Sequence, residues 1–373
     1  MRLGLDVSAV PPRVAGAGRY IVELSRRLPA RGVDTTLVTR RGDADRWRTW
    51  SPESTLAPVV PDRRVSRLVY EAWKLGVGPA ARGVDVWHSP HYTMPHRRLR
   101  PTVVTIHDLT FFSNPEWHER SKVTFFRRAI LYAARQADVL ISVSEFTARQ
   151  LDHLIPDHAP IVVAPHGVDL HAFRPQGDHD EERLTGLGLA ADTPYVFFLG
   201  TFEPRKGLDV LLDAFEVVAS TDPDVELWLA GQVGWGLEQL DARIARHPAA
   251  RRIRRLGFVD DAVLPTLLRR AMCVAYPSRG EGFGLPVLEA MACGSLVVTS
   301  SDTVMSEVAG DAAVFATPGD AAALATALLT QLDRDDDDRH ALGQRARSRA
   351  ERFTWEASVT MHLAAYDLAR EGT

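Results

Sequence analysis

Short apolar runs alternate with amphipathic, helix-like segments along almost the whole chain. The runs are rich in β-branched residues and continuously apolar, a pattern typical of strands covered on both faces in a parallel sheet. The first series of expected strands covers 2–7, 35–39, 84–88, 102–107, 139–143 and 161–164, and the second covers 195–199, 225–230, 253–256, 273–276 and 296–299. Two such series predict two doubly wound α/β domains.

The segment after the first strand of the second series has the clearest helical pattern. Its apolar residues fall on one helical face, and they are Leu208, Leu211, Leu212, Phe215 and Val218. A polar stretch, 175–182, interrupts the alternation and is the expected linker. We therefore predict a Rossmann-like N-terminal, acceptor-side domain over 1–175, completed by a C-terminal helix at 355–373, and a Rossmann-like donor-binding domain over 176–354. Since such sheets bind ligands at the carboxyl ends of their strands, two facing domains would share one interdomain cleft.

Composition narrows the class of protein. The chain of 373 residues is 25% charged with a net charge of −4, so it has no basic excess for nucleic acid. Cys273 and Cys293 lie in apolar runs without zinc-ligand spacing, and we expect buried thiols in a reducing compartment. Residues 2–7 indicate a first strand instead of a signal peptide, and no run reaches the roughly 18 apolar residues of a membrane span. A cytoplasmic protein is expected.

The most informative segment is 277–292, which follows an expected buried strand. Three glycines surround one acid, Glu281, and Pro286 fits the first turn of a following helix that also carries Glu289. Unpaired amides at such a helix start bind anions, and two carboxylates can accept hydrogen bonds from sugar hydroxyls. For Glu289 alone, the alternative is an acid stabilised by the helix dipole.

This Glu-x7-Glu pattern in a Gly-Phe-Gly-Leu-Pro loop resembles the donor-binding motif of retaining family-4 glycosyltransferases, which have the GT-B fold. The resemblance covers nearly the whole chain. It implies that Glu289 binds the donor ribose and that Glu281 contacts the transferred sugar. It also implies that the sugar and phosphate of the donor lie near the backbone of Gly282, Phe283, Gly284 and Leu285.

Two adjacent cations, Arg205 and Lys206, follow the expected strand 195–199 and the turn residue Gly200. A helix start disfavours positive charge, so an anion such as a diphosphate is the natural partner, and the family has an Arg and a Lys here for that purpose. The alternative is a pair of solvated surface cations. The Asp-x-Asp matches lie in polar stretches away from strand ends, so we expect no metal and no other cofactor.

The first domain offers a weaker glycine signal. Gly16 and Gly18 follow the first strand, but Ile21 stands where a dinucleotide fingerprint needs its third glycine, which argues against hydride transfer. The segment is similar to the family's glycine loop near the donor phosphate. The family also has a histidine beside the transferred sugar at the position of His107; the alternative is a satisfied core histidine. Segment 88–92 is a candidate lining of the acceptor pocket.

Two further expectations concern the base of the donor and the membrane. The base-reading residues are expected near Gly231 and in 257–260, which contains Val259. The expected helix 119–136 is basic and amphipathic, which is compatible with peripheral docking on the inner face of the cell membrane and with a lipid-linked acceptor. The alternative is a helix that covers the sheet and has a solvated polar face.

The resemblance therefore implies a retaining, metal-independent hexosyltransferase that acts on a nucleotide-sugar. The first expectation is mannose transfer from GDP-mannose to a glycan, a glycolipid or a small molecule. The alternatives are a UDP-sugar-dependent transferase, an epimerase or inverting enzyme of the same fold, and a non-catalytic nucleotide-sugar-binding protein. No first-domain acid is nominated as a nucleophile, so retention of configuration is inferred from the resemblance alone.

Overall fold

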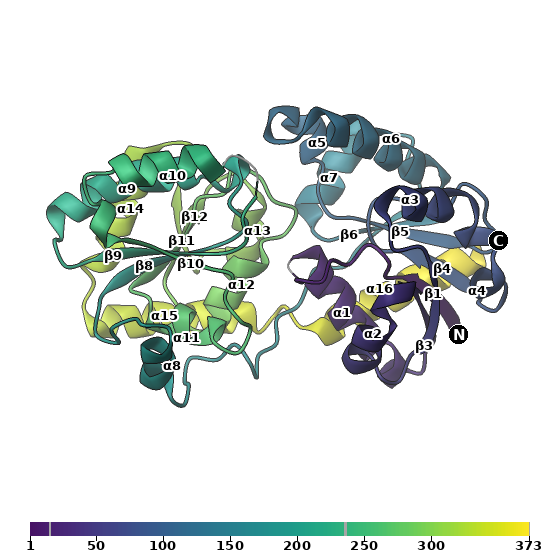
Figure 1. Ribbon diagram of the computed structural model, residues 1–373, viewed down its shortest axis with the longest axis horizontal. Helices are drawn as coiled ribbons and strands as arrows, with labels where there is room; N and C mark the ends of the chain where they lie inside the picture. The colour runs from purple at the N-terminus through teal and green to yellow at the C-terminus, as the bar shows by residue number, and fades with distance from the viewer. Residues whose placement is uncertain (15, 235–236, 373) are drawn as a thin grey trace. The chain divides into compact units, whose positions relative to one another are not determined.

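The computed structural model describes residues 1–14, 16–234 and 237–372. The chain divides into two compact units (Figure 1). The first comprises Met1–Gly167 and Trp355–Thr373, and the second comprises Val168–Thr354. Each unit is built on a parallel sheet with helices on both faces, which confirms the predicted fold class.

In its described residues the first unit has a seven-stranded sheet of order β3-β2-β1-β4-β5-β6-β7. The strands are β1 Arg2–Asp6, β2 Asp34–Arg40, β3 Thr55–Val60, β4 Val86–Ser89, β5 Thr102–Ile106, β6 Val139–Ser142 and β7 Ile161–Val163. The α-helices are α1 Ala17–Arg27, α2 Ala44–Trp50, α3 Arg64–Trp73, α4 Pro79–Arg82, α5 Thr110–Ser113, α6 Arg120–Gln136, α7 Glu145–Leu154 and α16 Trp355–Glu371. Helix α16 packs along β4, β5, β6 and β7 and against α1.

The second unit has, as far as it is described, a six-stranded sheet of order β10-β9-β8-β11-β12-β13. The strands are β8 Tyr195–Leu199, β9 Glu226–Ala230, β10 Ile253–Gly257, β11 Cys273–Tyr276, β12 Val297–Ser300 and β13 Val314–Ala316. The α-helices are α8 Asp180–Gly186, α9 Leu208–Thr221, α10 Leu237–Arg246, α11 Leu264–Arg270, α12 Leu285–Ala292, α13 Val304–Ala309, α14 Ala321–Leu332 and α15 Asp336–Ala350. Helices α9 and α10 lie over one face of the sheet, and α11 and α15 lie over the other (Figure 1).

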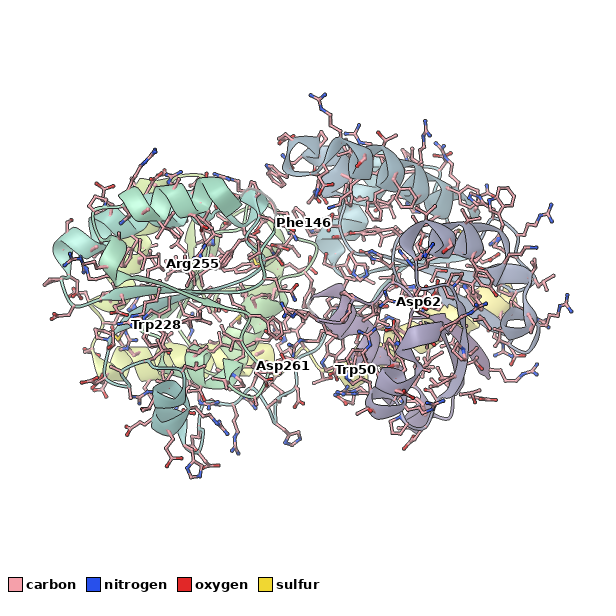
Figure 2. The ribbon with its side chains drawn as sticks, viewed as in Figure 1. Trp50, Asp62, Phe146, Trp228, Arg255 and Asp261 are labelled. Carbon is pink, nitrogen blue, oxygen red and sulfur yellow. The ribbon has the colours of Figure 1, made fainter. Side chains whose placement is uncertain are left out.

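Both sheets are buried by large side chains. In the second unit the rings of Tyr195 and Trp228 stack with centroids 3.7 Å apart across the neighbouring strands β8 and β9. Figure 2 labels Trp228 among the side chains of this unit. The apolar face predicted for 208–218 is buried in α9. Burial of an aromatic or leucine side chain stabilises the fold by roughly 1.5–3 kcal/mol. Packing of the apolar faces against one another therefore stabilises these strands and helices.

Two strands were missed by the sequence analysis. Strand β3 contains Pro58 and lies at the edge of its sheet, where a missing N–H does not interrupt the ladder. Strand β13 has only three residues, too few to show a periodic pattern.

The boundary between the units differs from the expected linker. It falls between Gly167 and Val168, ahead of 175–182. The intervening residues pack on the second unit, because Val168 N donates to Phe353 O at 3.1 Å and Arg347 Nη1 donates to Phe173 O at 2.7 Å. The polar composition of 175–182 reflects exposure and the start of α8, so this segment does not coincide with the boundary between the units.

Candidate active site

The carboxyl ends of β8 and β11 define the candidate site of the second unit. These strands are neighbours, and the chain proceeds from β8 to β9 on one side and from β11 to β12 on the other. A crevice forms where the strand order reverses in this way, and it is the usual ligand site of open parallel sheets. The predicted loops 200–207 and 277–284 are the two that follow these strands.

The two loops are joined through their backbones. Gly207 has a φ of 69°, and a Cβ there would lie 2.2 Å from Pro277 O, so only glycine allows this close approach. Arg279 N donates to Arg205 O at 2.8 Å. The junction therefore holds the cation-bearing loop against the acid-bearing loop.

The structure brings Arg205, Lys206 and Glu281 together. Arg205 Nη1 donates to Glu281 Oε2 at 2.7 Å, and Lys206 Nζ donates to Glu281 Oε1. Tyr276 OH and Ser278 Oγ also donate to Glu281 Oε1, at 3.0 and 2.7 Å. Because Lys206 is only 7% exposed and both cations are paired with a carboxylate, the alternative of two solvated cations is wrong.

These contacts set the charge states of the cluster. Burial alone would raise the pKa of Glu281, but Arg205 and Lys206 outweigh it and hold that pKa at about 2. Burial lowers the pKa of Lys206, assisted by the neighbouring Arg205 and opposed by Glu281. Glu281 is thus a permanent anion between two cations, and the cluster is a fixed set of charges at neutral pH.

Helix α12 carries the second predicted acid. Gly284 immediately precedes the helix with a φ of 103°, and Pro286 occupies its first turn, as the sequence indicated. Glu289 is buried within α12, and Gly282, Phe283, Gly284 and Leu285 are buried at its start. The helix begins directly after the loop that bears Glu281, so its N-terminal amides lie beside the charged cluster.

The loops after β9 and β10 lie along the same edge of the sheet as the loop after β8. Gly200 N donates to Ala230 O at 3.0 Å, and Gly231 N donates to Gly257 O at 2.7 Å. These bonds tie together the ends of β8, β9 and β10, and Val259 follows two residues after β10. Gly200 therefore begins the cation-bearing loop, and Gly231 and Val259 follow the next two strands of the sheet.

The first unit has the same reversal of strand order between β1 and β4. Gly16 precedes α1 with a φ of 41°, and Gly18 lies in its first turn. His107 directly follows β5 and is 8% exposed. The structure therefore places Gly16, Gly18 and His107 at the carboxyl end of this sheet, while Arg205, Lys206 and Glu281 belong to the second unit.

His107 has a defined proton arrangement. Its Nε2 is 2.8 Å from Pro90 O, and a carbonyl only accepts, so Nε2 carries the proton. Burial lowers the pKa of His107, opposed by the Pro90 bond and the charge of Asp108. The neutral ring then presents Nδ1 as an acceptor.

Beside His107 lies a buried network that the sequence did not reveal. Tyr20 OH bonds Thr105 Oγ1 at 2.9 Å and His362 Nε2 at 2.8 Å. His88 bonds Thr105 Oγ1 through Nε2 at 2.8 Å and Tyr366 OH through Nδ1 at 2.9 Å. His88 is fully buried, so it anchors α16 to the sheet and does not line an acceptor pocket as its segment suggested.

The comparisons with known proteins address the whole chain. The family model described as Glycosyltransferase Family 4 matches residues 14–172, and that described as Glycosyl transferases group 1 matches residues 180–349. The chain is 33% identical to O-antigen chain mannosyltransferase B of Escherichia coli over 284 residues. This match covers 76% of this chain and 74% of that protein. The chain belongs to glycosyltransferase family 4.

Other relatives of this glycosyltransferase agree with that assignment. A D-inositol 3-phosphate glycosyltransferase of Geodermatophilus obscurus is 31% identical, with 98% of this chain and 91% of that protein covered. The solved structure of sucrose-phosphate synthase from Thermosynechococcus elongatus has a TM-score of 0.78 at 22% identity, with 98% of each chain covered. That likeness shows a shared GT-B fold. The family supports a hexosyltransferase and not a non-catalytic nucleotide-sugar-binding protein.

Two remaining sequence expectations can be compared with the structure. Cys273 and Cys293 of this glycosyltransferase are buried free thiols, and burial raises the pKa of each to about 12. In the portion of the chain that is described, no helix combines the length and the apolar character needed to cross a membrane.

Proposed function

We propose that this glycosyltransferase transfers a hexose, with mannose from GDP-mannose as the first candidate, to a glycan, glycolipid or small-molecule acceptor, with retention and without a metal ion. The observation that carries the proposal is the largely buried cluster of Arg205, Lys206 and Glu281 at the switch point of the second sheet. Retention of configuration rests on the family alone.

In this proposal the two cations stabilise the departing diphosphate. Lys206 has three N–H donors, and two of them bond Tyr276 OH and Glu281. The third N–H has no assigned acceptor among the described residues and is available to a phosphate oxygen. A donor held in position before the reaction stabilises developing negative charge by about 3–4 kcal/mol. The cluster therefore supplies the charge that a metal supplies in other transferases.

The role proposed for Glu281 changes with this geometry. Both of its carboxylate oxygens accept hydrogen bonds from cations, so its first effect is to hold Arg205 and Lys206 in place. Contact with the transferred sugar, implied by the resemblance, would use the remaining lone pairs. The amides of Gly282, Phe283, Gly284 and Leu285 are proposed near sugar and phosphate, and Glu289 is proposed to bind the ribose.

In the first unit, Nδ1 of His107 is proposed to accept a hydrogen bond from a hydroxyl group of the transferred sugar. Its Nε2 bond to Pro90 O fixes the ring orientation, as a second hydrogen bond commonly does for functional histidines. Gly16 and Gly18 are proposed to approach the donor phosphate. Gly200, Gly231 and Val259 are proposed around the nucleotide base and ribose.

A thermal-shift screen with GDP, UDP, ADP and their sugars tests the donor. GDP-mannose is the first candidate donor because a relative is named as a mannosyltransferase. A UDP-sugar is the alternative donor. A ligand at one hundred times its dissociation constant stabilises the protein by about 2.7 kcal/mol, which is readily measured. A shift with UDP and none with GDP would overturn the guanosine assignment, and no shift with any nucleotide would overturn the donor site.

Peripheral membrane association is proposed through α3 instead of α6. The residues Phe126, Ile130 and Leu131 of α6 pack with the core of the first unit. On α3, by contrast, Val65 and Val69 are 76% and 59% exposed. Exposed basic residues flank this stripe, and they are Arg63 and Lys74. An apolar stripe with flanking cations favours anionic lipid. Co-sedimentation with vesicles rich in phosphatidylglycerol tests this proposal, since Val69→Glu should abolish binding at low salt.

A further inference from the structure

The loops that follow the neighbouring strands β4 and β5 are tied to each other at two points. At the first, His107 Nε2 is 2.8 Å from Pro90 O. At the second, Tyr92 OH donates to Asp108 Oδ2 at 2.9 Å and accepts from Asp108 N at 3.1 Å. One residue separates Pro90 from Tyr92, and His107 and Asp108 are adjacent in the chain. The position of Pro90 O beside His107 is therefore coupled to the bonds of Tyr92.

Tyr92 has an unusual backbone conformation for a residue with a large side chain. Its φ is 51°, in the left-handed region that favours glycine. Thr93 N donates to His91 O at 2.5 Å, so residues 91–93 form a γ-turn with Tyr92 at its centre. A γ-turn with a positive central φ is rare and strained, and it persists only where surrounding contacts hold it. Since glycine would adopt this conformation without strain, the contacts of the tyrosine side chain must offset the strain.

The side chain of Tyr92 is anchored in the core of the first unit. It is 4% exposed, and its ring packs edge-on against Phe111 and Phe126 with centroids 6.2 and 5.5 Å away. Its hydroxyl bonds Asp108, whose Oδ1 accepts from Thr110 N at 3.0 Å and from Thr110 Oγ1 at 2.6 Å. The carboxylate is thus oriented from both sides. A tyrosine so deeply buried acts on the reaction through its neighbours and not by contact with a substrate.

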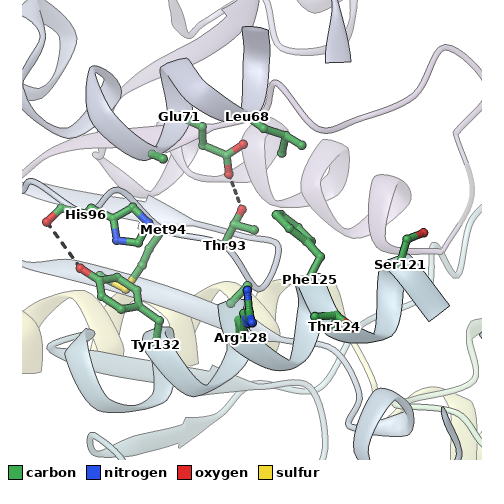
Figure 3. A pocket seen from close by; sticks show the side chains of 12 residues that line it. Leu68, Glu71, Thr93, Met94, His96, Ser121, Thr124, Phe125, Arg128 and Tyr132 are labelled. Atoms are coloured by element: carbon green, nitrogen blue, oxygen red, sulfur yellow. Dashed lines mark hydrogen bonds between the residues drawn. The ribbon is translucent and has the colours of Figure 1, made fainter. Parts of the chain in front are cut away.

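The far end of the γ-turn is anchored to α3. Thr93 lines a cavity of about 460 Å³ between α3 and α6 (Figure 3). Its Oγ1 donates to Glu71 of α3, as the dashed line in Figure 3 shows. The turn is therefore held by Asp108 through the hydroxyl of Tyr92 and by α3 through the hydroxyl of Thr93. Two independent anchors leave little freedom to the loop in which Pro90 lies.

The carbonyl of Pro90 selects one proton arrangement of the His107 ring. Because a carbonyl only accepts, the contact keeps the proton of His107 on Nε2 and leaves Nδ1 as the acceptor. The ring also packs edge-on against Tyr92 and Tyr20, with centroids 5.6 and 5.4 Å away. If Pro90 O moved away, Nε2 would lose its acceptor and both tautomers would become available.

We infer that Tyr92 and Asp108 are positioning residues for His107. Their hydrogen bonds hold the strained γ-turn, and the turn places Pro90 O against His107 Nε2. That contact presents Nδ1 of His107 as the acceptor for a hydroxyl of the transferred sugar. The inference rests on the proposed function for the contact between His107 and the sugar, whereas the orientation of the ring requires no ligand.

Tyr92→Phe, which removes the hydroxyl and keeps the ring, tests the effect on the reaction. We measure kcat for nucleotide release from GDP-mannose or UDP-glucose, whichever gives the larger thermal shift. The rate should fall by about three- to tenfold, which is no more than the loss expected for His107→Ala. The nucleotide thermal shift should keep its size, because the cations of the second unit are unchanged. In the His107→Ala protein the same substitution should cause no further loss, because its effect passes through the missing ring.

Tyr195→Phe is the matched control for lost stability. It also removes a buried tyrosine hydroxyl, which donates to Leu267 O at 2.8 Å in the second unit. Both tyrosine variants should therefore unfold at a lower temperature than the wild type, but only Tyr92→Phe should be slower. Equal loss of rate in the two variants would show that Tyr92 acts through stability alone and would overturn the inference.

NMR of the whole protein labelled with ¹⁵N-histidine reports the ring itself, without any ligand. The signals of His107 are those that disappear in His107→Ala. They should show one tautomer with the proton on Nε2 in the wild type, and a mixture of both tautomers in Tyr92→Phe and Asp108→Ala. An unchanged tautomer in both folded variants would overturn the inference, as would a further loss of rate when Tyr92→Phe is added to His107→Ala. A changed tautomer at the wild-type rate would support the positioning role and contradict the proposed sugar contact of His107.

Discussion

The two units have the same reversal of strand order, but different kinds of side chain meet at the carboxyl ends of the strands beside it. At the ends of β8 and β11, charged side chains meet, with Glu281 held between Arg205 and Lys206. At the ends of β1, β4 and β5, uncharged rings and hydroxyls meet, with Tyr20 and His88 sharing the Thr105 hydroxyl. The topology decides where a crevice lies, and the side chains decide what it can bind.

This difference matches the two halves of a transfer reaction. A departing diphosphate gains negative charge, so the second unit needs cations that are fixed in advance. A sugar hydroxyl is neutral, so the first unit needs oriented acceptors and no net charge. Burial lowers the pKa of His88, His107 and His362 alike, which keeps these three rings neutral at physiological pH.

The largest expected effect is that of Lys206→Ala. Removing one fixed donor of positive charge should lower kcat for donor turnover by about 10²–10³-fold. Lys122→Ala is the matched control, because Lys122 is a more exposed lysine that pairs with Glu119 on the surface. Circular dichroism should show both variants folded. A folded Lys206→Ala protein with the wild-type rate would contradict the role of the cluster.

The next effect concerns acid stability. Burial lowers the pKa of His362 to about 4, against 6.5 for the free side chain. The unfolded chain therefore binds a proton that the folded chain resists, and stability is lost as pH falls below 6.5 toward 4. For this one group the loss is about 3 kcal/mol. Glu281 has a depressed carboxyl pKa, so its contribution is lost only below the ordinary carboxyl value of 4.5.

Urea unfolding of the wild type and the His362→Gln variant between pH 7 and pH 4.5 measures the contribution of His362 to the free energy of unfolding. The variant should be less stable than the wild type at pH 7, and the difference should shrink as pH falls. Glu71, whose pKa is raised, has the opposite pH dependence but is present in both proteins and cancels in the comparison. The same exchange at exposed His153 is the control. An unchanged difference across this pH range would refute a titrating His362.

A smaller effect is expected from His107→Ala. Loss of one hydrogen-bond acceptor for a sugar hydroxyl should lower the transfer rate about tenfold. The midpoint of the nucleotide thermal shift should stay the same, because the cations of the second unit remain. Steady-state rates at saturating donor and acceptor provide the measurement. A loss of nucleotide binding together with the rate would instead place His107 in the donor site.

The smallest expected effect is that of thiol reagents. Cys273 and Cys293 both lie in the second unit, and burial raises their pKa to about 12. Iodoacetamide at pH 8 should therefore leave the native protein unlabelled and fully active. Mass spectrometry should detect label only after urea unfolds the second unit. Rapid labelling of the folded protein would show that this unit opens far more readily than its packing suggests.

Local patterns were sufficient to single out the residues that the structure brings together in the charged cluster of the second unit. The turn 277–284 and the cations at 205–206 each lie between a strand and a helix that are adjacent in sequence, so composition alone located them. Strand β3 was missed because its proline is tolerated only at an edge, which is a property of the sheet. The expected linker at 175–182 was wrong because exposure, and not a change of unit, made that segment polar.

The sequence by itself determined the alternation of strands and helices, the glycine turns and the family, since each depends on residues near one another in the chain. Only the tertiary structure decided that Glu281 pairs with cations about 75 positions earlier, and that α16 completes the histidine network of the first unit. The physical reason is that strand order brings distant loops together, and burial then sets their protonation. Strand order, and the burial of polar side chains that follows from it, is not encoded in a local pattern.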